Sequence, residues 1–98
     1  MAQFDVHRVA NGSLVVDCQS DSLIHLKTRV VAPLMRLDDA PAVATRLHPK
    51  FQIDSEPFVL ATHLLTALPT RDLGQALASL EAERYKIIAA LDMIITGI

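Results

Sequence analysis

The fold of this chain is decided by residues 3–18, QFDVHRVANGSLVVDC. Apolar and polar side chains alternate over residues 3–9, and this period of two is typical of a half-buried β-strand. Asn11-Gly12 follows, and both residue types accept the positive φ angles of a tight turn. Residues 13–18 then return to an apolar, β-branched pattern. The whole stretch therefore predicts an antiparallel hairpin.

Further strands are predicted along the chain. Residues 28–34 are a β-branched run in which Pro33, having no N–H, predicts an edge or a bulge. Residues 50–54 and 57–62 predict two short strands joined through Asp54-Ser55-Glu56, and the stretch to Leu68 predicts another before Pro69. The polar, Ala-containing segment between Pro41 and Pro49 predicts a loop. Five or so antiparallel strands without intervening helices predict a compact β-sheet or small barrel.

The C-terminal third predicts one amphipathic helix that lies across the sheet. Its apolar residues recur at helical spacing: Leu77, Leu80, Ile87, Ile88, Leu91, Ile94 and Ile95. Asp72 and Ser79 compete as N-cap, and Ser79 is favoured because Gly74 inside a helix costs about 1 kcal/mol relative to Ala. The helix is expected to end at Thr96, with Gly97 as its terminator. We expect one domain over residues 1–98, since no linker or repeat interrupts the pattern.

Charge and composition narrow the function classes. The net charge of −2 gives no electrostatic surface for binding nucleic acid unaided. No apolar run is long enough to span a bilayer and the N-terminus lacks a signal-peptide pattern, so we expect a cytoplasmic protein. The single cysteine, Cys18, cannot form an internal disulfide and is expected to be a buried, inert thiol. Hydrophobic residues make up 51% of this small chain, which predicts a second copy covering apolar surface.

The sequence contains no recognisable catalytic or metal-binding motif. It lacks a zinc spacing, a Gly-rich phosphate loop and a nucleophile elbow. The four histidines are scattered and are interpreted as surface or capping residues: His7, His25, His48 and His63. Asp38-Asp39 is interpreted as a solvated turn, and the polar group Asp17 to Asp21 as a turn in which side chains bond the nearby backbone. We therefore predict no catalytic residue, no cofactor and no metal.

Several segments, in order, resemble the CcdB family of toxins. The opening Gln3-Phe4-Asp5-Val6 resembles the family's first strand, and Val16-Asp17-Cys18-Gln19-Ser20-Asp21 is similar to its most specific block. Residues 28–34, TRVVAPL, resemble its next strand, and the chain closes on the family's Gly97-Ile98. The resemblance implies a mainly β fold with one C-terminal α-helix. That fold is a five-stranded antiparallel sheet of the SH3-like barrel type with a small accessory sheet, shared with the MazF toxins and assembled as a homodimer.

The resemblance also implies a function by binding. CcdB toxins bind the DNA gyrase A subunit and trap the enzyme on cleaved DNA, and a CcdA-like antitoxin neutralises them. DNA is then bound only through the toxin–antitoxin complex, which represses its own operon. The implied gyrase-binding residues are Gln3, Phe4, Ser20, Leu23, Asp92, Thr96, Gly97 and Ile98.

One departure from the family leaves alternatives open. The best-known members carry Trp where this chain has Thr96, and that ring stacks on an arginine of gyrase. Thr96 cannot make that contact, although it can cap the last helical turn. A second interpretation therefore stands beside the gyrase poison, a toxin-derived domain that acts only in antitoxin binding or repression. A third is a MazF-like endoribonuclease, because the MazF toxins share the implied fold.

Overall fold

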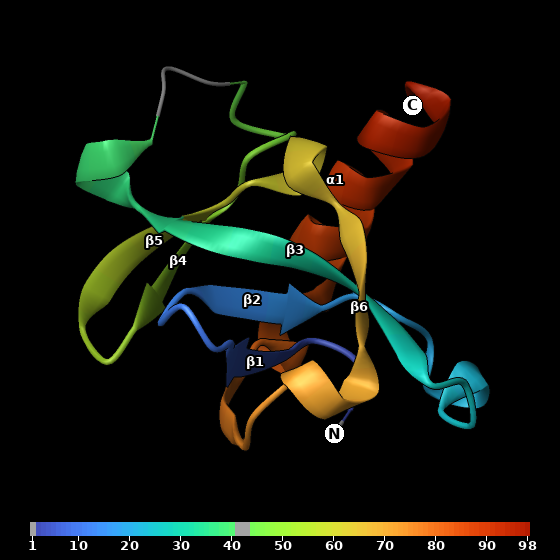
Figure 1. Ribbon diagram of the computed structural model, residues 1–98. Coiled ribbons are helices and arrows are strands. Elements are labelled where there is room, and N and C mark those ends of the chain that lie inside the picture. Colours follow the sequence, from blue (N-terminus) through green and yellow to red (C-terminus); the bar gives the residue numbers. More distant parts are fainter. Residues whose placement is uncertain (1, 41–43) are drawn as a thin grey trace.

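The computed structural model describes residues 2–40 and 44–98, which form one curled antiparallel sheet with a single C-terminal α-helix (Figure 1). The strands run in the order β4-β5-β3-β2-β1-β7, with β6 paired to β3. Their bounds are β1 Asp5–Arg8, β2 Leu14–Asp17, β3 Thr28–Arg36, β4 Lys50–Ile53, β5 Glu56–Leu60, β6 Thr66–Pro69 and β7 Ala76–Ser79. The helix α1 spans Arg84–Thr96. The predicted fold class is confirmed, and the accessory strands are continuous with the main sheet.

Both hairpin turns follow from their residue types. Gly12 has a φ of 89° in the β1–β2 turn, beside Asn11, whose side chain accepts from the Ser13 amide. In the β4–β5 hairpin, Ile53 pairs with Glu56, and Asp54 and Ser55 between them have φ angles of 53° and 67°. A two-residue loop with both φ angles positive matches the right-handed twist of the flanking strands.

Pro33 lies inside β3, the longest strand, in an unbroken register with β2, and not at the edge or bulge that the sequence predicted. Toward β2 it faces Val15. On its other side β3 changes partner, from β6 up to Val31 to β5 from Leu34 onward. The position of Pro33 between two partner strands is where a missing N–H costs least, and its carbonyl still accepts from the Ala61 amide at 2.8 Å.

The helix begins later than the sequence predicted. Ser79 is not its N-cap but the last residue of β7, an edge strand paired with β1. The Ser79 hydroxyl accepts from the Glu81 amide and so opens the short 3-10 turn Glu81–Glu83, after which α1 starts at Arg84. The first turn of the expected helix is thus a 3-10 turn, and residues 76–79, for which no strand was predicted, pair with β1. The predicted end is correct: Gly97 is left-handed, with a φ of 79°.

Both faces of the sheet are covered, which the strand pattern did not predict. The main core lies between one face and α1, and Leu80 and Ile87 pack there with Phe4 and Val6. On the opposite face the chain around Leu73 covers a smaller cluster with Val15 and Val31. His7 points to this second face and is 1% exposed, so it is not a surface residue. Its Nδ1 lies 2.8 Å from the Gly74 carbonyl oxygen.

Within the predicted loop between Pro41 and Pro49, residues 45–47 form a turn, while Pro41 lies outside the described residues. Within residues 2–40 and 44–98, no helix has the length and apolar character needed to cross a membrane.

Candidate partner-binding site

The predicted contact residues of α1 gather at its C-terminal tip. Thr96 donates its hydroxyl proton to the Asp92 carbonyl at 2.8 Å, and its Oγ1 accepts from the Ile98 amide at 3.4 Å. Gly97 closes the helix by donating to the Met93 carbonyl. The hydroxyl of Thr96 therefore caps the last turn, as expected. Beyond this cap Ile98 is 74% exposed, so an apolar side chain is presented to solvent at the end of a rigid helix.

A second set of predicted residues surrounds the short 3-10 turn η1, Asp21–Leu23. The Gln3 amide donates to Oδ1 of Asp21 at 2.8 Å, and Gln3 Nε2 donates to the Cys18 carbonyl at 3.1 Å. The Ser20 hydroxyl caps the turn by accepting from the Ser22 amide. Side chains of Asp and Ser thus bond the backbone here as the sequence predicted, and they join the N-terminal segment to the loop.

Phe4 does not belong to this surface. Its side chain is completely buried in the main core, and its φ of 70° turns it there. In this conformation its side chain is not accessible to a partner, and its contact with gyrase stays a prediction. Leu23, in contrast, is 42% exposed. The helix tip and the η1 loop lie at separate ends of the molecule in Figure 1, with the loop at the lower right and the tip at the upper right.

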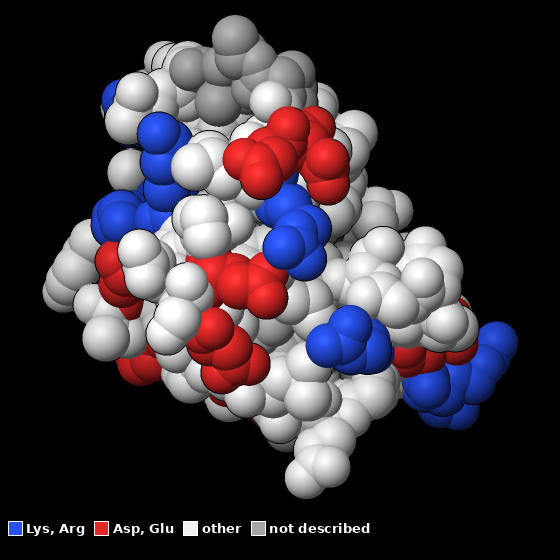
Figure 2. Space-filling model, turned by 90° about the vertical axis from the view of Figure 1, so that its left-hand side faces the viewer, with Lys and Arg blue, Asp and Glu red and all other residues white. Residues whose placement is uncertain are grey.

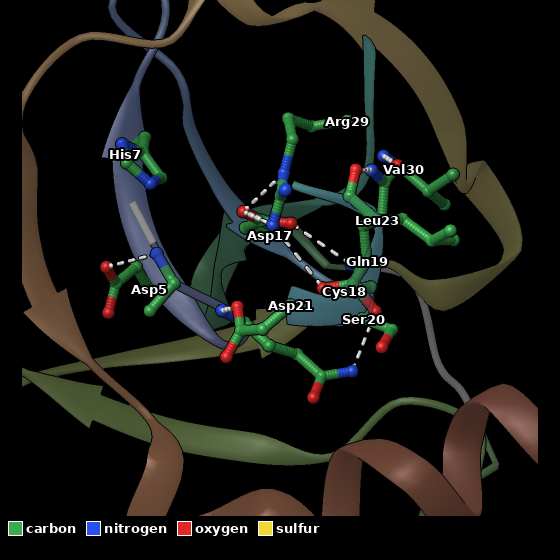
Figure 3. Close-up of polar contacts among 12 residues, drawn as sticks. Asp5, His7, Asp17, Cys18, Gln19, Ser20, Asp21, Leu23, Arg29 and Val30 are labelled. Carbon is green, nitrogen blue, oxygen red and sulfur yellow. Dashed lines mark hydrogen bonds and ion pairs between the residues drawn. The ribbon is translucent and has the colours of Figure 1, made fainter. Parts of the chain in front are cut away.

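Behind the η1 loop lies a buried ion pair that the sequence did not reveal. Arg29 Nη2 is 2.7 Å and Nε 2.9 Å from Asp17 Oδ2, and both side chains have no exposed surface (Figure 3). Arg29 also donates to the Gln19 carbonyl at 3.4 Å. Because Arg29 is enclosed in this way, it cannot contact a nucleic acid or an acidic peptide.

A groove of about 510 Å³ lies at the hairpin ends. Its charged lining residues are Arg8, Arg36, Asp39, Asp54 and Glu56. Arg36 and Glu56 form an exposed ion pair at 2.9 Å. Figure 2, viewed from the left-hand side of Figure 1, shows acidic and basic side chains interspersed on this face. With three carboxylates against two guanidinium groups, the groove does not favour a phosphodiester backbone.

His48 and His63 form a pair that the sequence did not predict. Nε2 of His48 lies 2.8 Å from Nδ1 of His63, so one ring donates to the other. His48 is 7% exposed and is not a surface residue either. Burial, and secondly the charge of His63, lower the pKa of His48 below its ordinary value of 6.5. The bond connects the turn before β4 to the 3-10 turn Thr62–Leu64, which neighbours α1.

Acidification is expected to destabilise the fold through this pair. As the pH falls through 6.5, the unfolded chain protonates His48 while the folded protein resists protonation, so the free energy of unfolding decreases. Urea unfolding at pH 7.5 and about pH 5.5 should show this decrease. The variant His48→Gln should show a smaller decrease, and the control His25→Gln, in an exposed loop, should behave like the unaltered protein. Equal decreases in His48→Gln and the unaltered protein would contradict the assignment.

Cys18 is expected to be unreactive in the folded protein. Burial, together with the charge of Asp17, raises the pKa of its thiol to about 12. The thiolate is the reactive form, so alkylation by iodoacetamide near pH 8 should be at least about a hundredfold slower than in the urea-unfolded chain. Mass spectrometry of the time course measures both rates. Similar rates in the two states would show that Cys18 is accessible.

Three solved structures similar to this one are toxins or endoribonucleases. The first is a "Crystal structure of Mtb toxin", with a TM-score of 0.71 and 18% sequence identity over 95% of this chain and 99% of that one. The second is the Mycobacterium tuberculosis toxin MazF-mt6, with a TM-score of 0.76 and 15% identity over 92% of this chain and 94% of that one. The third is an endoribonuclease in complex with its cognate antitoxin from a mycobacterial species, with a TM-score of 0.77 and 16% identity over 97% of this chain and 94% of that one. At these identities the likeness shows the fold, which is that of the small MazF-like and CcdB-like toxins.

The comparison with family profiles identifies a family and not only a fold. The sequence profile of the CcdB protein family matches residues 3–97, nearly the whole chain, and the chain therefore belongs to the CcdB family. A search of curated proteins found no match.

Proposed function

We propose that this protein is a toxin that binds the DNA gyrase A subunit and holds the enzyme on cleaved DNA. The observation that carries the proposal is the helix tip in a chain of the CcdB family: Thr96 and Gly97 close α1, and Ile98 projects from it, 74% exposed. An apolar side chain at the end of a capped helix suits insertion into a partner, because little order has to be gained on binding. The Ser20–Leu23 turn is the second contact.

The proposed assembly is a homodimer in the cytoplasm. Large apolar side chains remain exposed on the last turns of α1 and on the neighbouring 3-10 turn: Ile94 at 38%, Ile95 at 69% and Leu64 at 49%. A second copy of a small chain is the partner that such surface most simply fits. Sedimentation at micromolar concentration should give twice the monomer mass of 10.7 kDa.

An antitoxin is the second proposed partner. A structural neighbour, an endoribonuclease from a mycobacterial species, was solved in complex with its cognate antitoxin. We propose that a CcdA-like antitoxin folds on this chain through a disordered segment. The net charge of −2 fits a complex in which the antitoxin supplies the DNA-binding surface for repression.

Endoribonuclease activity is the rival proposal, because one of the three similar structures carries that name. Two observations speak against it. The groove at the hairpin ends has more carboxylates than guanidinium groups, and Arg29 is completely buried. An RNA-cleaving site needs an exposed basic surface and a positioned acid or base, so binding without catalysis is the better-supported function.

Purified protein, gyrase and supercoiled plasmid test the proposal directly. Quenching with detergent and protease should reveal linear DNA that depends on both proteins, whereas the same protein incubated with RNA should leave the RNA intact. RNA cleavage without linear DNA would favour the endoribonuclease. Tight antitoxin binding without binding to the A subunit would replace the proposal by a domain that acts only in antitoxin binding or repression.

A further inference from the structure

The loop from Ser20 to Leu26 presents apolar side chains to solvent. Leu23 is 42% exposed, Ile24 57% and Leu26 42%. The 3-10 turn η1 in this loop contains no buried residue, so apolar packing does not determine its position. A short loop with this composition would lower its free energy by turning such side chains inward, unless its backbone is fixed by contacts to the rest of the protein.

The side chain of Gln19 fixes the loop to strand β3. This side chain is 6% exposed and uses both ends of its amide (Figure 3). Nε2 donates to the Leu23 carbonyl at 3.1 Å, and Oε1 accepts from the Val30 amide at 3.1 Å. A single side chain therefore bridges the end of η1 and strand β3, just beyond the point where Cys18 pairs with Val30.

The backbone of Gln19 is itself fixed by the buried ion pair. Its N–H donates to Asp17 Oδ1 at 3.0 Å, and its carbonyl accepts from Arg29 Nη2 at 3.4 Å. Asp17 and Arg29 are fully buried and paired. The exposed loop is thus connected to the interior of the protein by a chain of hydrogen bonds that passes through Gln19.

We infer that Gln19 is a positioning residue for gyrase binding: it holds the Ser20–Leu26 loop in its binding conformation without touching the partner. The inference rests on the proposed function, in which Ser20 and Leu23 contact the A subunit. A loop that is ordered before binding loses less conformational entropy in the complex than a mobile one. Removing the bridge should therefore weaken binding although the contact side chains are unchanged.

The test compares two variants of the full-length protein. Gln19→Met keeps the size of the side chain and removes both hydrogen bonds. Ile53→Val, in the main core on β4, is a control with a similar small loss of stability. Titration with the gyrase A subunit should give a Kd for Gln19→Met about five- to tenfold higher than that of the unaltered protein. The Kd of Ile53→Val should be unchanged.

A second measurement separates positioning from general destabilisation. Amide hydrogen exchange at Leu23, Ile24 and Leu26, whose N–H groups bond within the loop, should accelerate in Gln19→Met while exchange in β1 and β2 stays unchanged. If Gln19→Met does not fold, Gln19→Asn is used, because an amide one methylene shorter cannot reach both partners.

The outcomes are distinguishable. Unaltered affinity of the Gln19 variant, with the unaltered protein binding tightly, would overturn the positioning role and leave the proposed function standing. A proportional loss of affinity in Ile53→Val would show that stability alone governs binding, and it would also overturn the inference. Failure of the unaltered protein to bind the A subunit would overturn the proposed function, and with it the role of Gln19.

Discussion

Deleting Gly97 and Ile98 is expected to abolish toxicity while leaving the fold intact. The two residues make only end-of-helix contacts: Gly97 donates to the Met93 carbonyl and Ile98 donates weakly to Thr96. Ile98 is 74% exposed, so its loss should change the free energy of unfolding by less than about 1 kcal/mol. The same side chain, buried in a partner, contributes about 1.5–3 kcal/mol, which corresponds to roughly a 10- to 150-fold change in Kd for each tip.

Colony counts after induction, together with the Kd for the gyrase A subunit, measure this effect. The matched control is Tyr85→Ala, which removes a side chain that is 76% exposed at the opposite end of α1. That variant should stay toxic. Toxicity of the truncated protein equal to that of the intact one would rule out insertion of the tip. Loss of toxicity in Tyr85→Ala as well would show that expression or folding was measured, and not the contact.

Replacing Arg29 by Met is expected to be the most destabilising single change considered for this protein. It leaves the Asp17 carboxylate buried, with no exposed surface and without its partner at 2.7 Å. Breaking a buried pair in this way costs about 3–5 kcal/mol, a large share of the roughly 5–15 kcal/mol that holds a small protein together. For a chain of this size, Tm should fall by on the order of 20 °C.

Urea unfolding of three variants separates the buried charge from the loss of a contact. The control Arg36→Met breaks an ion pair whose side chains are 63% and 49% exposed, and it should cost at most about 1 kcal/mol. The double variant Asp17→Asn with Arg29→Met should recover part of the stability lost in Arg29→Met, because no unpaired charge remains buried. Equal losses in Arg29→Met and Arg36→Met would show that water reaches Asp17.

The residues that the sequence predicted for the candidate site differ in their exposure. The sequence resemblance pointed to the helix tip and to Ser20 and Leu23, and these residues are exposed. It also pointed to Phe4, which lies in the core. A family pattern alone does not distinguish residues that pack in the core from residues that contact a partner. The burial of Phe4 is known only from the structure. Neither Gln19 nor Arg29 was expected in the site, because their role depends on hydrogen bonds between segments.

The sequence by itself determined those features of this protein that depend on neighbouring residues along the chain. Asn11-Gly12 marks the first turn, where Gly12 has the positive φ, and Asp54-Ser55 lies in the predicted connection between two strands. Alternation marks the first strand, and Gly97 ends the helix. These signals are local because the steric limits on φ and ψ, and the periods of strand and helix, act within a few residues.

Only the tertiary structure decided the features that depend on contacts between distant segments. Residues 76–79, which lie before the expected helix and were not predicted to form a strand, form β7 because β1 offers an unpaired edge. His7 is buried because the chain near Gly74 covers the second face of the sheet, and Arg29 becomes an internal cation because Asp17 meets it across two strands. Burial and pairing across the sheet are properties of the packed chain, because the two residues of each contact lie in segments that are separated in the sequence.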